Sequence, residues 1–162
     1  MEAYFTLYLQ IEKPSVEKFI KKMMTRGKRP DFDDEVPVFR RKAFSVLEFT
    51  EYADEINKID NDYFEMVWSV LGGQVIKEIN NICSGLHLAG ATNMIGSFDD
   101  DEDTNEVVVW DGSRLRILQG IDENPIQLFS DKMAGSKNYA DTINTIFQNI
   151  DEGQYTLGPA IY

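Results

Sequence analysis

Cys83 and His87 are the two residues of this sequence whose types and spacing come closest to a reactive site. They lie four residues apart, so a helix through both would align them as a thiolate pair or as half of a zinc site. The chain contains one cysteine and one histidine, so nothing of either type remains to complete a tetrahedral zinc site. Gly85 lies between them and is expected to end a helix there. We interpret Cys83 as a buried thiol and His87 as a capping or core residue, and we predict no catalytic residue, metal site or cofactor.

A run of consecutive acidic side chains is the second candidate, formed by Asp99, Asp100, Asp101, Glu102 and Asp103. Alternate carboxylates in such a run are typical of a calcium-binding loop. The calcium pattern then fails twice, because Thr104 stands where the loop needs glycine and Trp110 stands where it needs glutamate. Adjacent carboxylates repel one another, so they are stable in solvent or against a cationic partner. The run is therefore expected to be an exposed acidic loop.

Two further acidic segments are candidates for the same role. The first lies in an expected loop and consists of Asp31, Asp33, Asp34 and Glu35, and the second consists of Asp122 and Glu123. Asp151 and Glu152 follow as lesser contributors. Together with the run from Asp99 to Asp103, these segments are predicted to contact a basic partner.

The net charge of −12 excludes several classes of function. Residues 1–42 hold ten Lys/Arg against seven Asp/Glu, whereas residues 43–162 hold six against twenty-one. Binding to phosphate needs clustered Lys and Arg, so we expect neither nucleic acid nor anionic membrane as a partner. The sequence shows no signal peptide and no apolar stretch of transmembrane length, so we expect a cytoplasmic protein.

One long helix, from Asp62 to Gly85, is predicted to organise the core. Apolar residues recur at steps of three and four, which favours one helical face: Phe64, Trp68, Leu71, Val75, Ile79, Ile82 and Leu86. Asp62 followed by Glu65 resembles a capping box. Gly72 and Gly73 disfavour a helix interior, so a break into two helices or a hairpin turn there is the main alternative to one helix. Residues Glu65–Val70 do not alternate, which weighs against a strand.

Shorter elements are expected around this helix. Ala3–Ile11 alternates and predicts a central strand, while Val16–Thr25, Glu48–Ile59 and Tyr139–Ile150 read as helices. Asp111-Gly112 predicts a hairpin between Glu106–Trp110 and Arg114–Leu118. Leu86–Phe98 is expected to be irregular or weakly extended. Ile126–Phe129 is expected to add a strand, and the tail Gly153–Tyr162 to dock on the core. The fold class predicted for the single domain 1–162 is α+β, one mostly antiparallel sheet with three or four helices.

By elimination, the sequence favours a binding protein that acts through its surface. The leading hypothesis is an immunity-type inhibitor that occludes the active site of a basic toxin nuclease, since complementary charge speeds and orients association. A mimic of nucleic acid that occupies a host DNA-binding protein is a second hypothesis. An enzyme that uses Asp/Glu chemistry in a cleft, and an adaptor or structural subunit, are the alternatives from other classes.

Overall fold

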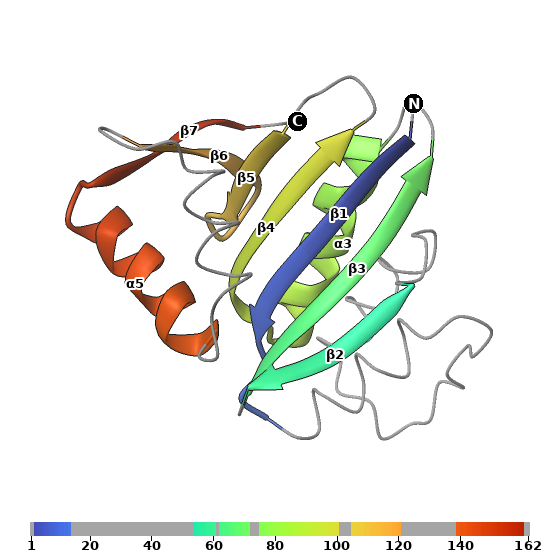
Figure 1. Cartoon of the computed structure of the whole chain (residues 1–162), viewed down its shortest axis with the longest axis horizontal. Helices are drawn as coiled ribbons and strands as arrows, with labels where there is room; N and C mark the ends of the chain where they lie inside the picture. Colours follow the sequence, from blue (N-terminus) through green and yellow to red (C-terminus); the bar gives the residue numbers. More distant parts are fainter. Residues whose placement is uncertain are drawn as a thin grey trace.

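The computed structural model of the chain describes residues 2–13, 54–60, 62–71, 75–100, 105–120 and 139–160. These residues form seven strands and two helices (Figure 1). The strands are β1 (Glu2–Gln10), β2 (Glu55–Asp60), β3 (Tyr63–Leu71), β4 (Thr92–Asp100), β5 (Asn105–Trp110), β6 (Leu115–Gly120) and β7 (Tyr155–Ala160). The helices are α3 (Val75–Ala89) and α5 (Tyr139–Asp151).

All seven strands belong to one sheet, in the order β2-β3-β1-β4-β5-β6-β7. Every neighbouring pair is antiparallel. Strand β1 lies between β3 and β4, so the prediction that the first strand is central is confirmed. Its alternation explains its place, because Phe5, Leu7 and Leu9 are fully buried on one face of the sheet.

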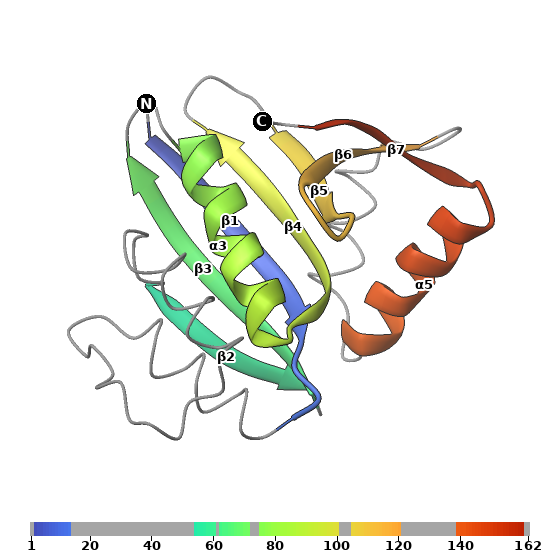
Figure 2. The same cartoon turned by 180° about the vertical axis from the view of Figure 1, so that it is seen from behind.

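Helix α3 packs across one face of the sheet, as Figure 2 shows. Ile79, Ile82, Cys83 and Leu86 of the helix are fully buried with apolar side chains of β1, β3, β4 and β5. The helix ends in a Schellman motif, in which the N–H of Gly90 donates to His87 O and the N–H of Ala91 donates to Leu86 O. Gly90 has a φ of 109°, which a glycine adopts without steric cost.

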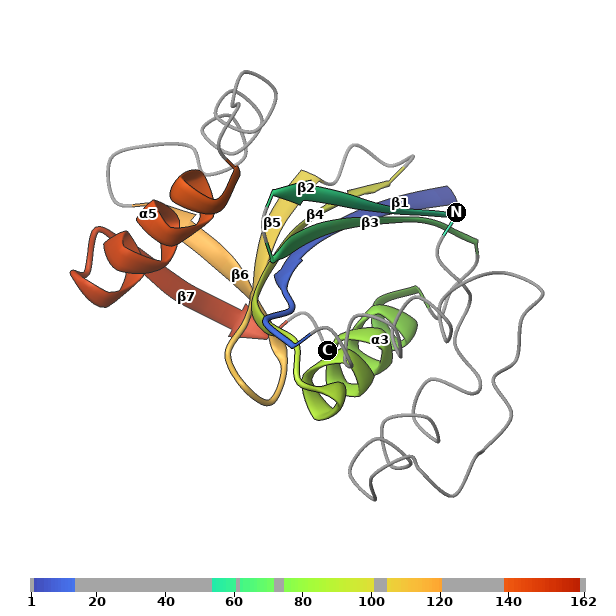
Figure 3. The same ribbon diagram turned by 90° about the horizontal axis from the view of Figure 1, so that it is seen from below.

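Helix α5 packs on the opposite face of the same sheet (Figure 3). Ile143 and Ile146 are its buried residues, and they form a second core with side chains from β1, β3, β4, β5, β6 and β7. The sheet thus separates two apolar clusters. The helix predicted over Tyr139–Ile150 is confirmed, and the C-terminal tail docks as β7, paired with β6.

The prediction of a long central helix from Asp62 to Gly85 is wrong, and with it the α+β fold with three or four helices. The described residues instead form mostly one antiparallel sheet with two short helices. The stretch divides into β3, which ends at Leu71, and α3, which begins at Val75, so it is neither one helix nor the two helices or the hairpin of the alternative. Helix α3 also continues past Gly85 to Ala89.

The physical reason for this error is that β3 carries apolar residues on both faces, since Tyr63 and Val67 lie on the face opposite Phe64, Met66 and Trp68. Phe64, Met66 and Trp68 are buried against α3, while Tyr63 is buried on the face that carries α5. A strand with apolar contacts on both faces loses the alternation that marks a strand with one wet face. A spacing of four, as between Phe64 and Trp68, suits a strand face as well as a helix face because four is even.

Other predicted elements have mixed outcomes. The hairpin around Asp111-Gly112 is confirmed, with β5 and β6 as its arms. The helix expected over Glu48–Ile59 is wrong where the chain is described, because residues Glu55–Asp60 form β2. Leu86–Phe98, expected to be irregular or weakly extended, is the end of α3 followed by β4, so the extended alternative holds from Thr92 on. The elements predicted at Val16–Thr25 and Ile126–Phe129 lie outside the described residues. In the described part of the chain, no helix has the length and apolar character needed to cross a membrane.

Candidate functional site

Asp99 and Asp100 are the members of the predicted acidic partner surface that the structure describes best. They are the last two residues of β4, and the side chain of Asp99 is exposed. Asp151 and Glu152 are also exposed, at the end of α5. The remaining predicted residues lie outside the described part of the chain: Asp101, Glu102, Asp103, Asp31, Asp33, Asp34, Glu35, Asp122 and Glu123.

The Cys83–His87 pair does not form a reactive site. The pair lies on the continuous helix α3, but Cys83 is fully buried in the core, and its burial raises the pKa of the thiol well above its ordinary value. His87 is exposed, and its ring lies 5.8 Å from that of Trp110. A thiol that is kept neutral and away from solvent is neither a nucleophile nor a metal ligand. Across the described ranges, no group of three or more His, Cys, Asp or Glu side chains is placed to hold a metal ion.

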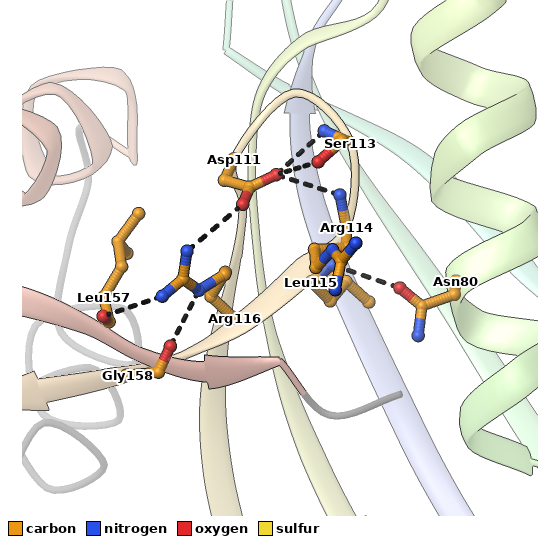
Figure 4. Close-up of polar contacts among 8 residues, drawn as sticks. All are labelled: Asn80, Asp111, Ser113, Arg114, Leu115, Arg116, Leu157 and Gly158. Atoms are coloured by element: carbon orange, nitrogen blue, oxygen red, sulfur yellow. Dashed lines mark hydrogen bonds and ion pairs between the residues drawn. The ribbon is translucent and has the colours of Figure 1, made fainter.

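A polar cluster surrounds Asp111 at the turn between β5 and β6 (Figure 4). Its Oδ1 accepts hydrogen bonds from the N–H groups of Ser113 (2.8 Å) and Arg114 (2.9 Å), and its Oδ2 lies 3.6 Å from Arg116 Nη1. Arg116 Nε also donates to Gly158 O in β7 at 2.7 Å. Desolvation by itself raises the pKa of Asp111, but these donors outweigh it and lower the pKa below its ordinary value. The cluster links the β5–β6 turn to β7 and so has a structural role.

A second polar group joins α5 to the sheet. The hydroxyl of Tyr8 donates to Glu65 Oε2 at 2.9 Å, and the ring of Tyr8 stacks on Tyr139, the first residue of α5, at 6.0 Å. The hydroxyl of Tyr63 donates to Asn144 Oδ1 of α5 at 2.8 Å. Burial, followed by the hydrogen bond to Glu65 and its charge, raises the pKa of Tyr8 far above the ordinary range of tyrosine. A phenol held so firmly in its neutral form is a hydrogen-bond donor and no general base.

Beyond Tyr8, neither of the two described helices covers the face of the sheet that carries α5, and Tyr4 and Asp99 are exposed there. Cross-strand register places its side chains in rows, with Tyr4 beside Asp99, and Thr6 between Val67 and Ser97. Glu55 and Asn57 of β2 extend this face past β3. This face points toward the reader in Figure 1, with α3 behind the sheet. We call it the open face, and it consists of Tyr4, Thr6, Glu55, Asn57, Val67, Ser97 and Asp99.

The open face combines an exposed aromatic ring with acidic and small side chains. Tyr4 is 52% exposed, although it lies on a central strand. Asp99, Glu55 and Asn57 are exposed, while Thr6, Val67 and Ser97 are half-buried. The seven described residues that define this face include two carboxylates, Glu55 and Asp99, and no Lys or Arg. Lys58 of β2 lies on the other side of the sheet, with its ammonium 5.6 Å from the centre of the Phe64 ring.

The sequence interpretation missed Tyr4 and Glu55 as candidates for binding. A signal for Tyr4 was present, since the alternation of Ala3–Ile11 separates the apolar Phe5, Leu7 and Leu9 from a face of aromatic and polar residues. Glu55 had no comparable signal, because the apolar residues of Glu48–Ile59 have the spacing of a helix.

Comparison of the chain with protein-family models, curated protein sequences and solved structures finds no match.

Proposed function

We propose that this protein is an acidic cytoplasmic inhibitor that binds a basic protein, with a toxin nuclease as the leading candidate partner. The observation that supports the proposal is the open face, which combines an exposed aromatic ring on a central strand with carboxylates, and whose described residues include no basic side chain. Exposed aromatic residues on rigid scaffolds anchor protein interfaces, and carboxylates at the rim attract cationic partners.

A nuclease is the favoured partner because its active site must be basic to hold phosphate. An inhibitor that covers such a site gains from carboxylates that take the place of the phosphates. The net charge of −12 strengthens long-range attraction to the same partner. Cys83, Asp111 and Tyr8 do not support a catalytic function. Cys83 is fully buried, and Asp111 and Tyr8 make structural hydrogen bonds.

The experiment starts from the protein encoded immediately upstream of this chain. Its C-terminal domain is purified, its nuclease activity is assayed with and without this protein, and association is followed by stopped flow. We expect one-to-one inhibition of the nuclease and association that slows as salt is raised, because exposed charges are screened over about 8 Å at physiological ionic strength. Failure to bind or inhibit that domain contradicts the proposal.

A variant with two charge reversals makes the test specific to the open face. Glu55→Lys combined with Asp99→Lys is expected to slow association about tenfold at low salt and much less at high salt. The matched control is Asp151→Lys combined with Glu152→Lys, which makes the same change of net charge at the exposed end of α5. Equal slowing by both pairs would show that net charge, and not the open face, guides the partner.

A further inference from the structure

The pairing of Tyr4 with Asp99 gives the open face a specific chemistry. The two residues are direct cross-strand partners on β1 and β4, and both are exposed. Directly opposed side chains in an antiparallel pair have Cβ atoms about 5 Å apart. The register therefore places the Cβ atoms of a tyrosine and an aspartate side by side on two hydrogen-bonded strands, so that the ring and the carboxylate can contact the same group.

The next row of the sheet leaves space beside this pair. Tyr4 is followed on its face by Thr6, and Asp99 is preceded by Ser97, which is the cross-strand partner of Thr6. Both are short side chains, so β1 and β4 present no bulky neighbour to a side chain that lies against the Tyr4 ring from this direction. One row further, Tyr8 has the same ring as Tyr4, but it is covered by Tyr139 and its hydroxyl is bonded to Glu65. Tyr4 is therefore the accessible aromatic anchor of the row that α5 does not reach.

A ring beside a carboxylate favours arginine over other side chains. The planar guanidinium stacks on an aromatic face and, at the same time, donates two parallel hydrogen bonds to a carboxylate. Lysine has a compact charge without a plane to stack, and a phosphate would be repelled by Asp99 and Glu55. Glu55 lies on the same face beyond β3 and offers a second carboxylate to a basic surface.

We propose that the open face recognises an arginine side chain of its protein partner, stacked on Tyr4 and paired with Asp99. The inference rests on the proposed function, and it names the group of the partner that the face binds. For a nuclease, such an arginine is one of those that hold phosphate in its active site. Covering that arginine blocks the site.

The test uses two short capped peptides that differ only in carrying arginine or lysine, titrated into the isotope-labelled full chain at low salt. We expect the arginine peptide to bind about threefold more tightly than the lysine peptide. We also expect it to shift the amide resonances of Tyr4, Thr6, Ser97 and Asp99. Equal affinity for the two peptides, or shifts confined to other surfaces, overturns the inference.

Variants of Tyr4 test whether the preference for arginine depends on the aromatic ring. Tyr4→Ala should abolish the preference for arginine, while Tyr4→Phe should retain it because the ring remains. Leu88→Ala is the matched control, since Leu88 is an exposed apolar residue on α3. Circular dichroism establishes that each variant is folded. A preference that survives Tyr4→Ala, or disappears in Leu88→Ala, contradicts the assignment.

The same variants distinguish this inference from the proposed function. If the upstream nuclease domain is inhibited equally by the parent and by Tyr4→Ala, the function stands and the arginine site falls. If the arginine peptide binds as described but the nuclease domain does not, the arginine site stands and the function falls.

Discussion

Asp111 shows how one ionised side chain can hold together a junction of several elements. Two backbone N–H groups and the hydroxyl of Ser113 donate to its carboxylate, and Arg116 extends the cluster to β7. These donors favour the ionised form, so the pKa of Asp111 in the folded protein lies below that of the unfolded chain. Ionised Asp111 therefore stabilises the fold above a pH of about 3.9. That contribution is lost as the pH falls through the lower pKa of the folded state.

Asp111→Asn tests this contribution, because the amide oxygen can still accept from the backbone while the charge is removed. The variant is expected to be less stable than the parent at pH 7, by about 1 kcal/mol or less. Denaturant unfolding of both proteins between pH 7 and pH 2.5 measures the difference. The difference should shrink as the pH falls below about 4. A difference that is constant or grows at low pH would show that the charge of Asp111 is not the stabilising feature.

Among the strands, Gly96 of β4 allows the Phe5 side chain and the backbone of β1 to approach β4 closely. A Cβ atom at this position would lie 2.7 Å from Phe5 Cε2 and 2.7 Å from the carbonyl oxygen of Thr6. The oxygen belongs to the backbone of the central strand and cannot move without disturbing the sheet. Glycine at this position therefore lets the Phe5 ring lie over β4, where it also stacks with Trp68 at 5.7 Å.

Gly96→Ala is expected to destabilise the protein by about 1–3 kcal/mol, as overpacking in a core does. Gly158→Ala in β7 is the matched control. Its Cβ would also come within 2.7 Å of a neighbour, but that neighbour is the end of the flexible Gln119 side chain. The control should cost less than about 1 kcal/mol. Thermal and denaturant unfolding compare the two variants, and equal losses would mean that contact with the backbone of β1 does not set the cost.

At the scale of the whole molecule, the large negative charge opposes compaction. A net charge of −12 repels itself in the folded state more strongly than in the expanded chain, so screening should stabilise the fold. We expect the Tm to rise as NaCl is increased from about 0.01 M to about 0.1 M, where the Debye length shortens from about 30 Å to about 10 Å.

A variant of lower charge provides the control for this salt effect. Asp151→Lys with Glu152→Lys has a net charge of −8, because each reversal adds two positive units to −12. Differential scanning calorimetry should show a smaller rise in Tm for this variant than for the parent over the same range of salt. An equal rise in both proteins would attribute the effect to the salt itself and not to screened repulsion.

The sequence by itself determined the elements whose signals are local. The alternation of Ala3–Ile11 predicted β1, the Asp111-Gly112 turn predicted the β5–β6 hairpin, and the spacing of Ile143, Ile146 and Ile150 predicted α5. Each of these segments has one face that differs from the other, or a turn that few residue pairs can form, so its pattern is legible without its neighbours. The sequence also identified Cys83 as a buried thiol, because the chain has no second cysteine for a disulfide and only one histidine toward a zinc site.

Only the tertiary structure decided the identity of β3 and the position of the open face. Tyr63–Leu71 has apolar residues on both faces, with Phe64, Met66 and Trp68 in the core under α3 and Tyr63 in the core under α5, and such a pattern does not distinguish a strand from a helix. The open face depends on where α5 stops, with Tyr139 over Tyr8 and Tyr4 left exposed. It also depends on a register that places Asp99 beside Tyr4, ninety-five positions away in the sequence. Contacts between segments so distant in the chain are fixed by packing, and no local pattern encodes them.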